Sequence, residues 1–93
     1  MKIPKKVKVG PHTYEILRVD EIKEDDDSFA YGETCFEDLR IKVKNGMAST
    51  QEKETFLHEI LHACAPHCPE QFIDQIGHNL LQTLVDNKLD FLS

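Results

Sequence analysis

The spacing of the apolar residues changes at Asn45-Gly46, and this change constrains the fold more than any other feature. Before it, apolar residues alternate with charged ones, as at Ile41 and Val43, which is typical of half-buried strands. After it, they recur every three or four positions, which is typical of amphipathic helices. Strands followed by helices predict an α+β domain, with a small antiparallel or mixed sheet of three to four strands packed on two helices.

Four strands are expected within about residues 2–45. Lysines alternate with Val7 and Val9, and the turn residues Gly10-Pro11 lead into a second strand at about 13–19. Residues 29–35 and 40–44 are the third and fourth strands, and the charges of the fourth predict that it lies at a sheet edge. The acidic stretch at 24–28 is expected to be a solvated loop, because it lacks the spacing and the glycine of a calcium-binding EF-hand.

Two helices are expected next, at about 50–65 and 69–90. Ser49, with Glu52 three residues later, indicates a capping box at the start of the first helix. Pro66 ends this helix, and Pro69 suits the first position of the second. The predicted core face of the first helix contains Phe56, Leu57, Ile60, Leu61 and Cys64, and that of the second contains Phe72, Ile73, Ile76, Leu80 and Leu84. One domain over residues 1–93 accommodates all of these elements.

The composition narrows the classes of function. The formal net charge of −6 over 93 residues argues against nonspecific nucleic-acid binding, which needs an excess of Lys and Arg. No apolar run is long enough to span a bilayer and no signal peptide is visible, so a cytoplasmic location is expected. In that compartment Cys35, Cys64 and Cys68 are expected to be free thiols or metal ligands.

The residues His58-Glu59-Ile60-Leu61-His62 fit the pattern His-Glu-x-x-His inside the first predicted helix. Histidines four apart lie one above the other on a helix, so both imidazoles can bind one metal ion. Glu59 lies about 100° round the helix from His58, near enough to act on a water without binding the metal. Zinc lowers the pKa of a water that it binds to about 7, and the carboxylate takes up the proton as general base. The alternative is a pair of surface histidines on an amphipathic helix.

A third zinc ligand is expected from the second helix, because a catalytic zinc uses three protein ligands and one open position. Glu70, Asp74 and His78 line up there at intervals of four. Asp74 is central to this stripe and is the predicted ligand, whereas Glu70 belongs to the first turn, where a carboxylate stabilises the helix N-terminus. His78 would give a site of three histidines, and Asp74 could instead accept a hydrogen bond from the imidazole N–H of a ligand.

The chain resembles the small zincin-like metallopeptidases of phages and prophages, which are akin to minigluzincins and more distantly to the ImmA/IrrE group. The residues that carry the resemblance are Lys2-Ile3-Pro4-Lys5-Lys6-Val7, Tyr14-Glu15, Tyr31-Gly32-Glu33-Thr34, Thr55-Phe56-Leu57-His58-Glu59-Ile60-Leu61-His62-Ala63 and Leu80-Leu81-Gln82-Thr83-Leu84-Val85-Asp86-Asn87. The resemblance implies zinc as the cofactor, a sheet packed on an active-site helix, and an acidic third ligand on a second helix, at the position of Asp74.

The chain departs from this family in the group that stabilises the oxyanion. Peptidases of the gluzincin type usually place a Tyr or His after the metal ligands for this purpose. Tyr14 and Tyr31 precede the ligands here, which leaves His67 and His78. The segment Cys64-Ala65-Pro66-His67-Cys68 has a separate possible use, because with Cys35 it could form a second zinc site of three cysteines and one histidine. The alternative for these cysteines is small thiols near the core.

Two functions are compatible with these residues. The leading hypothesis is a zinc-dependent peptidase that hydrolyses a peptide bond in a peptide or protein substrate, which pairs with the predicted edge strand at Arg40–Lys44. The rival is a noncatalytic binding module of phage origin, which keeps zinc for stability and acts through protein–protein contact. Glu59 favours the enzyme, because a structural zinc site has no use for a carboxylate at that place.

Overall fold

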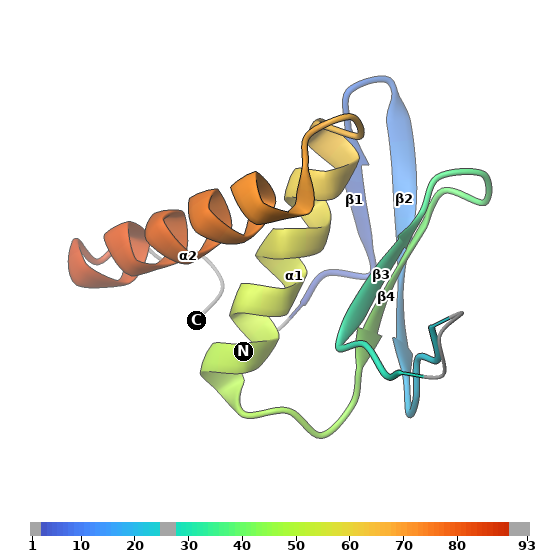
Figure 1. The fold of residues 1–93 in the computed structure, drawn as a ribbon, viewed down its shortest axis with the longest axis horizontal. Coiled ribbons are helices and arrows are strands. Elements are labelled where there is room, and N and C mark those ends of the chain that lie inside the picture. The colour runs from blue at the N-terminus through green and yellow to red at the C-terminus, as the bar shows by residue number, and fades with distance from the viewer. Residues whose placement is uncertain (1–2, 25–27, 90–93) are drawn as a thin grey trace.

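The computed structural model describes residues 3–24 and 28–89, and Figure 1 shows how they are arranged. Four strands form one sheet, and helix α1 (Ser49–Cys64) packs across one face of it. Helix α2 (Glu70–Asp86) lies on the far side of α1 from the sheet, and among the described elements it contacts α1 alone. The predicted α+β class is therefore confirmed, with a mixed sheet of four strands and two helices.

Two hairpins make up the sheet. β1 (Lys6–Val9) pairs antiparallel with β2 (His12–Val19), and β3 (Gly32–Cys35) pairs antiparallel with β4 (Arg40–Lys44). β2 and β4 run parallel side by side, so the strand order is β1-β2-β4-β3. The turn of the first hairpin contains Gly10, whose φ of 59° is a conformation that residues with a Cβ rarely adopt.

The fourth strand does not lie at an edge, contrary to the prediction from its charges. β4 lies between β2 and β3, and its residues Ile41 and Val43 are completely buried. The basic residues of β4 alternate with these two and therefore face away from α1. Alternation thus indicates which face of a strand is buried, but it does not indicate whether other strands flank it. The edge strands are β1 and β3, and β3 is shorter than the predicted segment 29–35.

The core lies between the sheet and α1. Its buried cluster consists of Tyr14, Ile16, Ile41, Val43 and Phe56. Phe56 is the buried apolar residue of α1, and an ion pair between Arg18 of β2 and Glu52 of α1 adds a contact between the two layers. The residue before α1 is Ala48, and no side chain caps this helix end, so the capping box predicted at Ser49 does not form.

α2 buries much less of its surface than its sequence predicts. Ile73 is 2% exposed and packs toward α1 with Gly77, but Phe72, Ile76 and Leu80 are 51%, 48% and 38% exposed. These three were expected in the core face; they remain outside it because α2 packs on a single helix, which covers only a narrow stripe. Pro69 is the N-cap residue of α2, whereas the sequence predicted it at the first position of the helix, one residue further along. No helix in the part of the chain that the structure describes has the length and apolar character to cross a membrane.

Candidate metal centre

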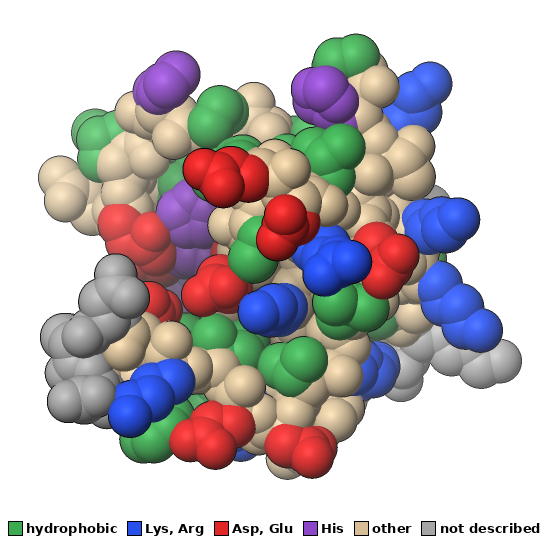
Figure 2. Space-filling view, turned by 90° about the vertical axis from the view of Figure 1, so that its right-hand side faces the viewer, with side chains coloured by type: hydrophobic (Ala, Val, Ile, Leu, Met, Phe, Trp, Pro, Cys, Tyr) green, Lys and Arg blue, Asp and Glu red, His purple; other side chains and the backbone are tan. Residues whose placement is uncertain are grey.

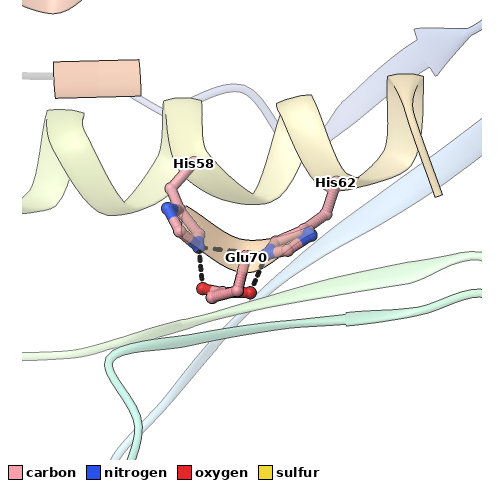
Figure 3. Close-up of side chains that lie close together, drawn as sticks. All are labelled: His58, His62 and Glu70. Carbon is pink, nitrogen blue, oxygen red and sulfur yellow. Dashed lines mark hydrogen bonds and ion pairs between the residues drawn. The ribbon is translucent and has the colours of Figure 1, made fainter. Parts of the chain in front are cut away.

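Three side chains from the two helices converge at one point (Figure 3). The Nε2 atoms of His58 and His62, both on α1, lie 3.0 Å apart. The carboxylate of Glu70, the first residue of α2, places Oε1 2.8 Å from Nε2 of His58 and Oε2 2.8 Å from Nε2 of His62. Among the residues that the structure describes, this is the one group of three or more potential ligands within reach of a single metal ion.

The local fold explains why these residues meet. His58 and His62 are four residues apart, so their rings project from the same face of α1, with ring centroids 4.6 Å apart. α1 ends at Cys64, and the chain reverses within residues 65–69, with a backbone hydrogen bond from Cys68 N to Ala65 O. α2 therefore begins beside the C-terminal half of α1, and the side chain of its first residue lies next to the two imidazoles.

The donor set fits a catalytic zinc ion. Two imidazole nitrogens and one carboxylate are the His2Glu combination of zinc peptidases, which leaves the fourth tetrahedral position open. Zinc–ligand bonds of about 2.0–2.1 Å set the ligand atoms of a tetrahedral site roughly 3.3 Å apart. One ligand atom from each of the three residues lies within 4.8 Å of the other two, so the group is already close to that arrangement. The contacts between the ring nitrogens and the carboxylate oxygens can be made either by imidazole N–H groups that donate to Glu70 or by a metal ion that all three side chains bind.

Exposure to solvent differs among the three side chains. Those of His58 and His62 are 18% and 21% exposed, whereas that of Glu70 is 63% exposed. The histidines are thus held by the surrounding protein, and the site opens to solvent on the side of Glu70. A metal ion bound here would be accessible to water and to a substrate, as a catalytic site requires and a closed structural site does not.

Asp74 contacts His58 from the other side of its ring. Its Oδ1 atom lies 3.1 Å from Nδ1 of His58, while Nε2 of the same ring points to Glu70. A proton held on Nδ1 by Asp74 leaves the lone pair on Nε2 directed at the metal position, which is the arrangement that carboxylates beside metal-binding histidines produce. The geometry thus brings Glu70, rather than the predicted Asp74, next to both Nε2 atoms, and places Asp74 against Nδ1 of His58.

The remaining histidines and the cysteines do not join this cluster. Nδ1 of His78 lies 3.3 Å from Oε1 of Glu54, and His78 is 68% exposed. His67 lies exposed in the turn after α1. The second site considered for the three cysteines and His67 does not form among the described residues. Cys35 instead lies on β3, where its Sγ contacts Oε1 of Glu33 at 3.1 Å, because the strand holds it away from the turn that follows α1.

Glu59 is buried beside the cluster, with 6% of its surface exposed. Burial raises the pKa of its carboxyl group; a hydrogen bond from Thr34 and the neighbouring histidines oppose this effect. The Oγ1 atom of Thr34 lies 2.9 Å from Oε1 of Glu59 and 3.0 Å from its backbone oxygen. Thr34 has a single hydroxyl proton, so its hydroxyl donates to one of these two oxygens at a time.

β3 forms one wall of the hollow that contains Glu59. This hollow, of about 410 Å³, is also lined by α1 and by Glu70 and Asp74 of α2. A Cβ at Gly32 would lie 2.7 Å from Cγ2 of Thr55 and 2.9 Å from Cγ of Glu59, so only glycine allows β3 to approach α1 this closely.

The outer edge of β3 carries the backbone groups of Gly32 and Thr34. The backbone N–H of Lys44 in β4 donates to the backbone oxygen of Tyr31, and in an antiparallel pair the residues that bond the partner strand alternate with residues that face away from it. The N–H and C=O groups of Gly32 and Thr34 therefore point away from β4, toward the edge of the sheet.

No protein-family model matches the chain, and no curated protein or solved structure is significantly similar to it. The functional interpretation therefore rests on the chemistry of the residues themselves.

Proposed function

We propose that this protein is a zinc-dependent metallopeptidase. The observation that carries the proposal is the convergence of His58, His62 and Glu70 next to the buried carboxylate of Glu59. Zinc, when bound, supplies a Lewis acid that polarises a carbonyl group and makes water acidic enough to attack it at neutral pH. The spacing of the two histidines on α1, the order of the elements and an acidic residue on the second helix support the proposed relationship to zincin-like peptidases.

Side chains of the protein supply the general base, hold it and a ligand in position, and stabilise the oxyanion. Glu59 acts as general base, because its carboxylate lies in the hollow beside the ligands and can take the proton from the attacking water. The same carboxyl group then donates that proton to the amine that leaves. Thr34 holds the carboxyl group in place through its hydroxyl, and Asp74 orients the ring of His58. His78 lines a hollow together with His58, which keeps it as the candidate for stabilising the oxyanion.

The substrate is expected to bind along β3 rather than along Arg40–Lys44, because β4 is flanked on both sides. An extended peptide can add to the open edge of β3 through the backbone groups of Gly32 and Thr34. Both residues line the hollow in which Glu59 and the histidines lie, so a peptide held there has a carbonyl group within reach of the metal position.

Metal analysis and peptide hydrolysis test the proposal together. Purified protein is expected to hold one zinc per chain, and the double variant His58→Ala/His62→Ala is expected to hold none. His67→Ala is the matched control, because it removes an exposed histidine outside the cluster and should leave the zinc content unchanged. Protein that neither contains zinc nor takes it up from solution would contradict the proposal.

Glu59→Gln separates the enzyme from the binding module. The amide is nearly isosteric with the carboxyl group but cannot accept a proton, so the variant should keep zinc and lose hydrolysis. Hydrolysis at the parent rate in this variant would exclude Glu59 as the base. A parent protein that holds zinc and cleaves no peptide in a broad library would instead favour the noncatalytic binding module.

A further inference from the structure

The charged residues that line the hollows around His58 and His62 are mainly acidic. Three hollows meet at His58, and their lining includes five acidic side chains: Glu24, Glu54, Glu59, Glu70 and Asp74. No Lys or Arg among the described residues lines any of the three, although the chain contains 11 of them. In Figure 2, acidic side chains lie next to a recessed histidine on the left of the face, and Lys and Arg side chains lie over its middle, right and lower left.

The lining of these hollows stays negatively charged when the two charges of a bound zinc ion are included. The two charges of Zn²⁺ offset those of its ligand Glu70 and of Glu59. Glu33 also borders one hollow, but its carboxylate lies on the sheet face away from α1, where its Oε1 is 3.8 Å from Nζ of Lys42. Glu24 and Glu54 remain at the rim, and Asp74 lies on the side of His58 away from the metal position. The walls of the hollows therefore stay acidic in the zinc-loaded protein.

Exposed aromatic side chains stand at both ends of β3. Tyr31 precedes the strand and is 54% exposed, and Phe36 follows it and is 44% exposed. Each lines a hollow that Glu24 also lines. An aromatic face next to a carboxylate recognises a Lys or Arg side chain, because the ring attracts the cation through its π-electrons and the carboxylate through its charge. Neither aromatic ring belongs to the buried core, so both are available to a ligand.

We infer that the substrate is a peptide segment with Lys or Arg near the bond to be cleaved, bound in extended form along β3. This inference rests on the proposed peptidase function. The backbone of the segment pairs with Gly32 and Thr34, and its cationic side chains lie against Tyr31 and Glu24 at one end of the strand and against Phe36 at the other. Glu54, at the rim near His58 and His78, provides a further carboxylate for a cation on the side of α2.

Binding of matched peptides to zinc-loaded Glu59→Gln protein tests the inference without relying on turnover. One probe is a short fluorescent peptide that contains arginine, and the other carries neutral citrulline at the same positions. The arginine peptide should bind at least about tenfold more tightly, as measured by fluorescence anisotropy. The preference should shrink at high ionic strength, because the carboxylates at the rim are exposed. Equal affinities, or a preference for citrulline, would overturn the inference.

Variants assign the preference to the groove. Glu24→Gln and Glu54→Gln should each reduce the preference for arginine severalfold, and Glu15→Gln should not. Glu15 is the matched control because it is an exposed carboxylate on the sheet face away from α1. An equal loss in all three variants would attribute the preference to net charge and contradict a specific groove.

Hydrolysis by the parent protein keeps the two proposals distinguishable. A parent that cleaves the citrulline peptide as fast as the arginine peptide refutes the preference and upholds the peptidase. A protein that binds the arginine peptide preferentially but cleaves neither refutes the peptidase, and leaves a module that recognises cationic peptides.

Discussion

The two helices have similar lengths but differ in how they are packed. α1 lies between the sheet and α2, and its residues Phe56 and Glu59 are buried. Among the described elements, α2 contacts only α1, and much of its apolar surface is exposed. Both helices nevertheless supply the candidate site, since α1 carries the two histidines and α2 carries Glu70 and Asp74.

This difference indicates which ligand side chains are already held in position before a metal ion binds. The distance between His58 and His62 is set by the geometry of α1 itself, which the sheet holds in place. The position of Glu70 depends on the turn at 65–69 and on the packing of α2 against α1, which buries little apolar area. A zinc ion would therefore connect a well-anchored helix to a weakly anchored one, and its binding energy would add to the stability of the α1–α2 contact.

The largest effect is expected from removal of the α2 ligand. Glu70→Ala should weaken zinc binding by more than about 100-fold, because it deletes one of three ligands. Asp74→Ala should weaken it by about 10–100-fold, since only the partner of the His58 ring is lost. Competition with a fluorescent zinc chelator measures both affinities.

His78→Ala is the control for this pair, because His78 bonds Glu54 outside the cluster. It should bind zinc as tightly as the parent. A loss of affinity that is greater for Asp74→Ala than for Glu70→Ala would restore Asp74 as the third ligand. A dominant loss for His78→Ala would point to a site of three histidines.

Two glycine variants compare how tightly α1 packs on each side. Gly32→Ala should lower the free energy of unfolding by about 1–3 kcal/mol, because the new Cβ overlaps Thr55 and Glu59. Gly77→Ala should have no destabilising effect or add about 0.5–1 kcal/mol, since its Cβ would meet Cδ1 of Leu61 at 3.4 Å and alanine favours a helix. Chemical denaturation of metal-free protein checks both values. Equal destabilisation by the two variants would show that the two interfaces of α1 are equally tight.

Glu59→Gln should stabilise the metal-free protein at neutral pH. Burial raises the pKa of Glu59 in the folded state, so ionisation of this group costs folding free energy. That cost appears as the pH rises from the unfolded to the folded pKa, and it is absent below the unfolded pKa of about 4.3. Melting temperatures with a chelator present should therefore favour the variant at pH 7 and converge with those of the parent in acid. A variant that is less stable than the parent at pH 7 would show that the Thr34 bond outweighs burial.

The smallest effect is expected from the cysteines near the turn between the helices. Cys64→Ser and Cys68→Ser, made singly, should leave the zinc content unchanged, because neither thiol belongs to the cluster. Elemental analysis of the purified variants measures this. Loss of one zinc equivalent from either variant would mean that the turn itself binds metal and helps to fix α2.

The sequence predicts the α1 side of the site better than the α2 side. The spacing of His58 and His62 is a property of one helix, so local periodicity suffices to bring their rings together. The choice between Glu70 and Asp74 depends on where α2 starts relative to α1, which a four-residue stripe does not encode. A usable signal was present in the short connection at 65–69, which forces the first turn of α2 to lie beside the end of α1.

The sheet shows the same limit of sequence reasoning. Alternation at Arg40–Lys44 correctly identified a strand, but the burial of Ile41 and Val43 between two neighbours follows from the parallel pairing with β2. The importance of β3 was also hidden, because Gly32 and Thr34 form a short strand with no apolar pattern. Apolar patterning reports the burial of side chains; it does not report which backbone groups are left without a partner.

The parallel pairing of β2 with β4 has a consequence for how the chain folds. Each hairpin forms between neighbouring segments, whereas joining them requires closure of the long connection from β2 to β4, which includes β3. α1 contacts β1 of the first hairpin and β3 and β4 of the second, so its full packing surface forms only after the two hairpins have joined. During synthesis, α2 leaves the ribosome after the other five described elements. Capture of zinc is therefore expected to be the final step of folding, and a chain stalled before Glu70 would carry both histidines without a complete site.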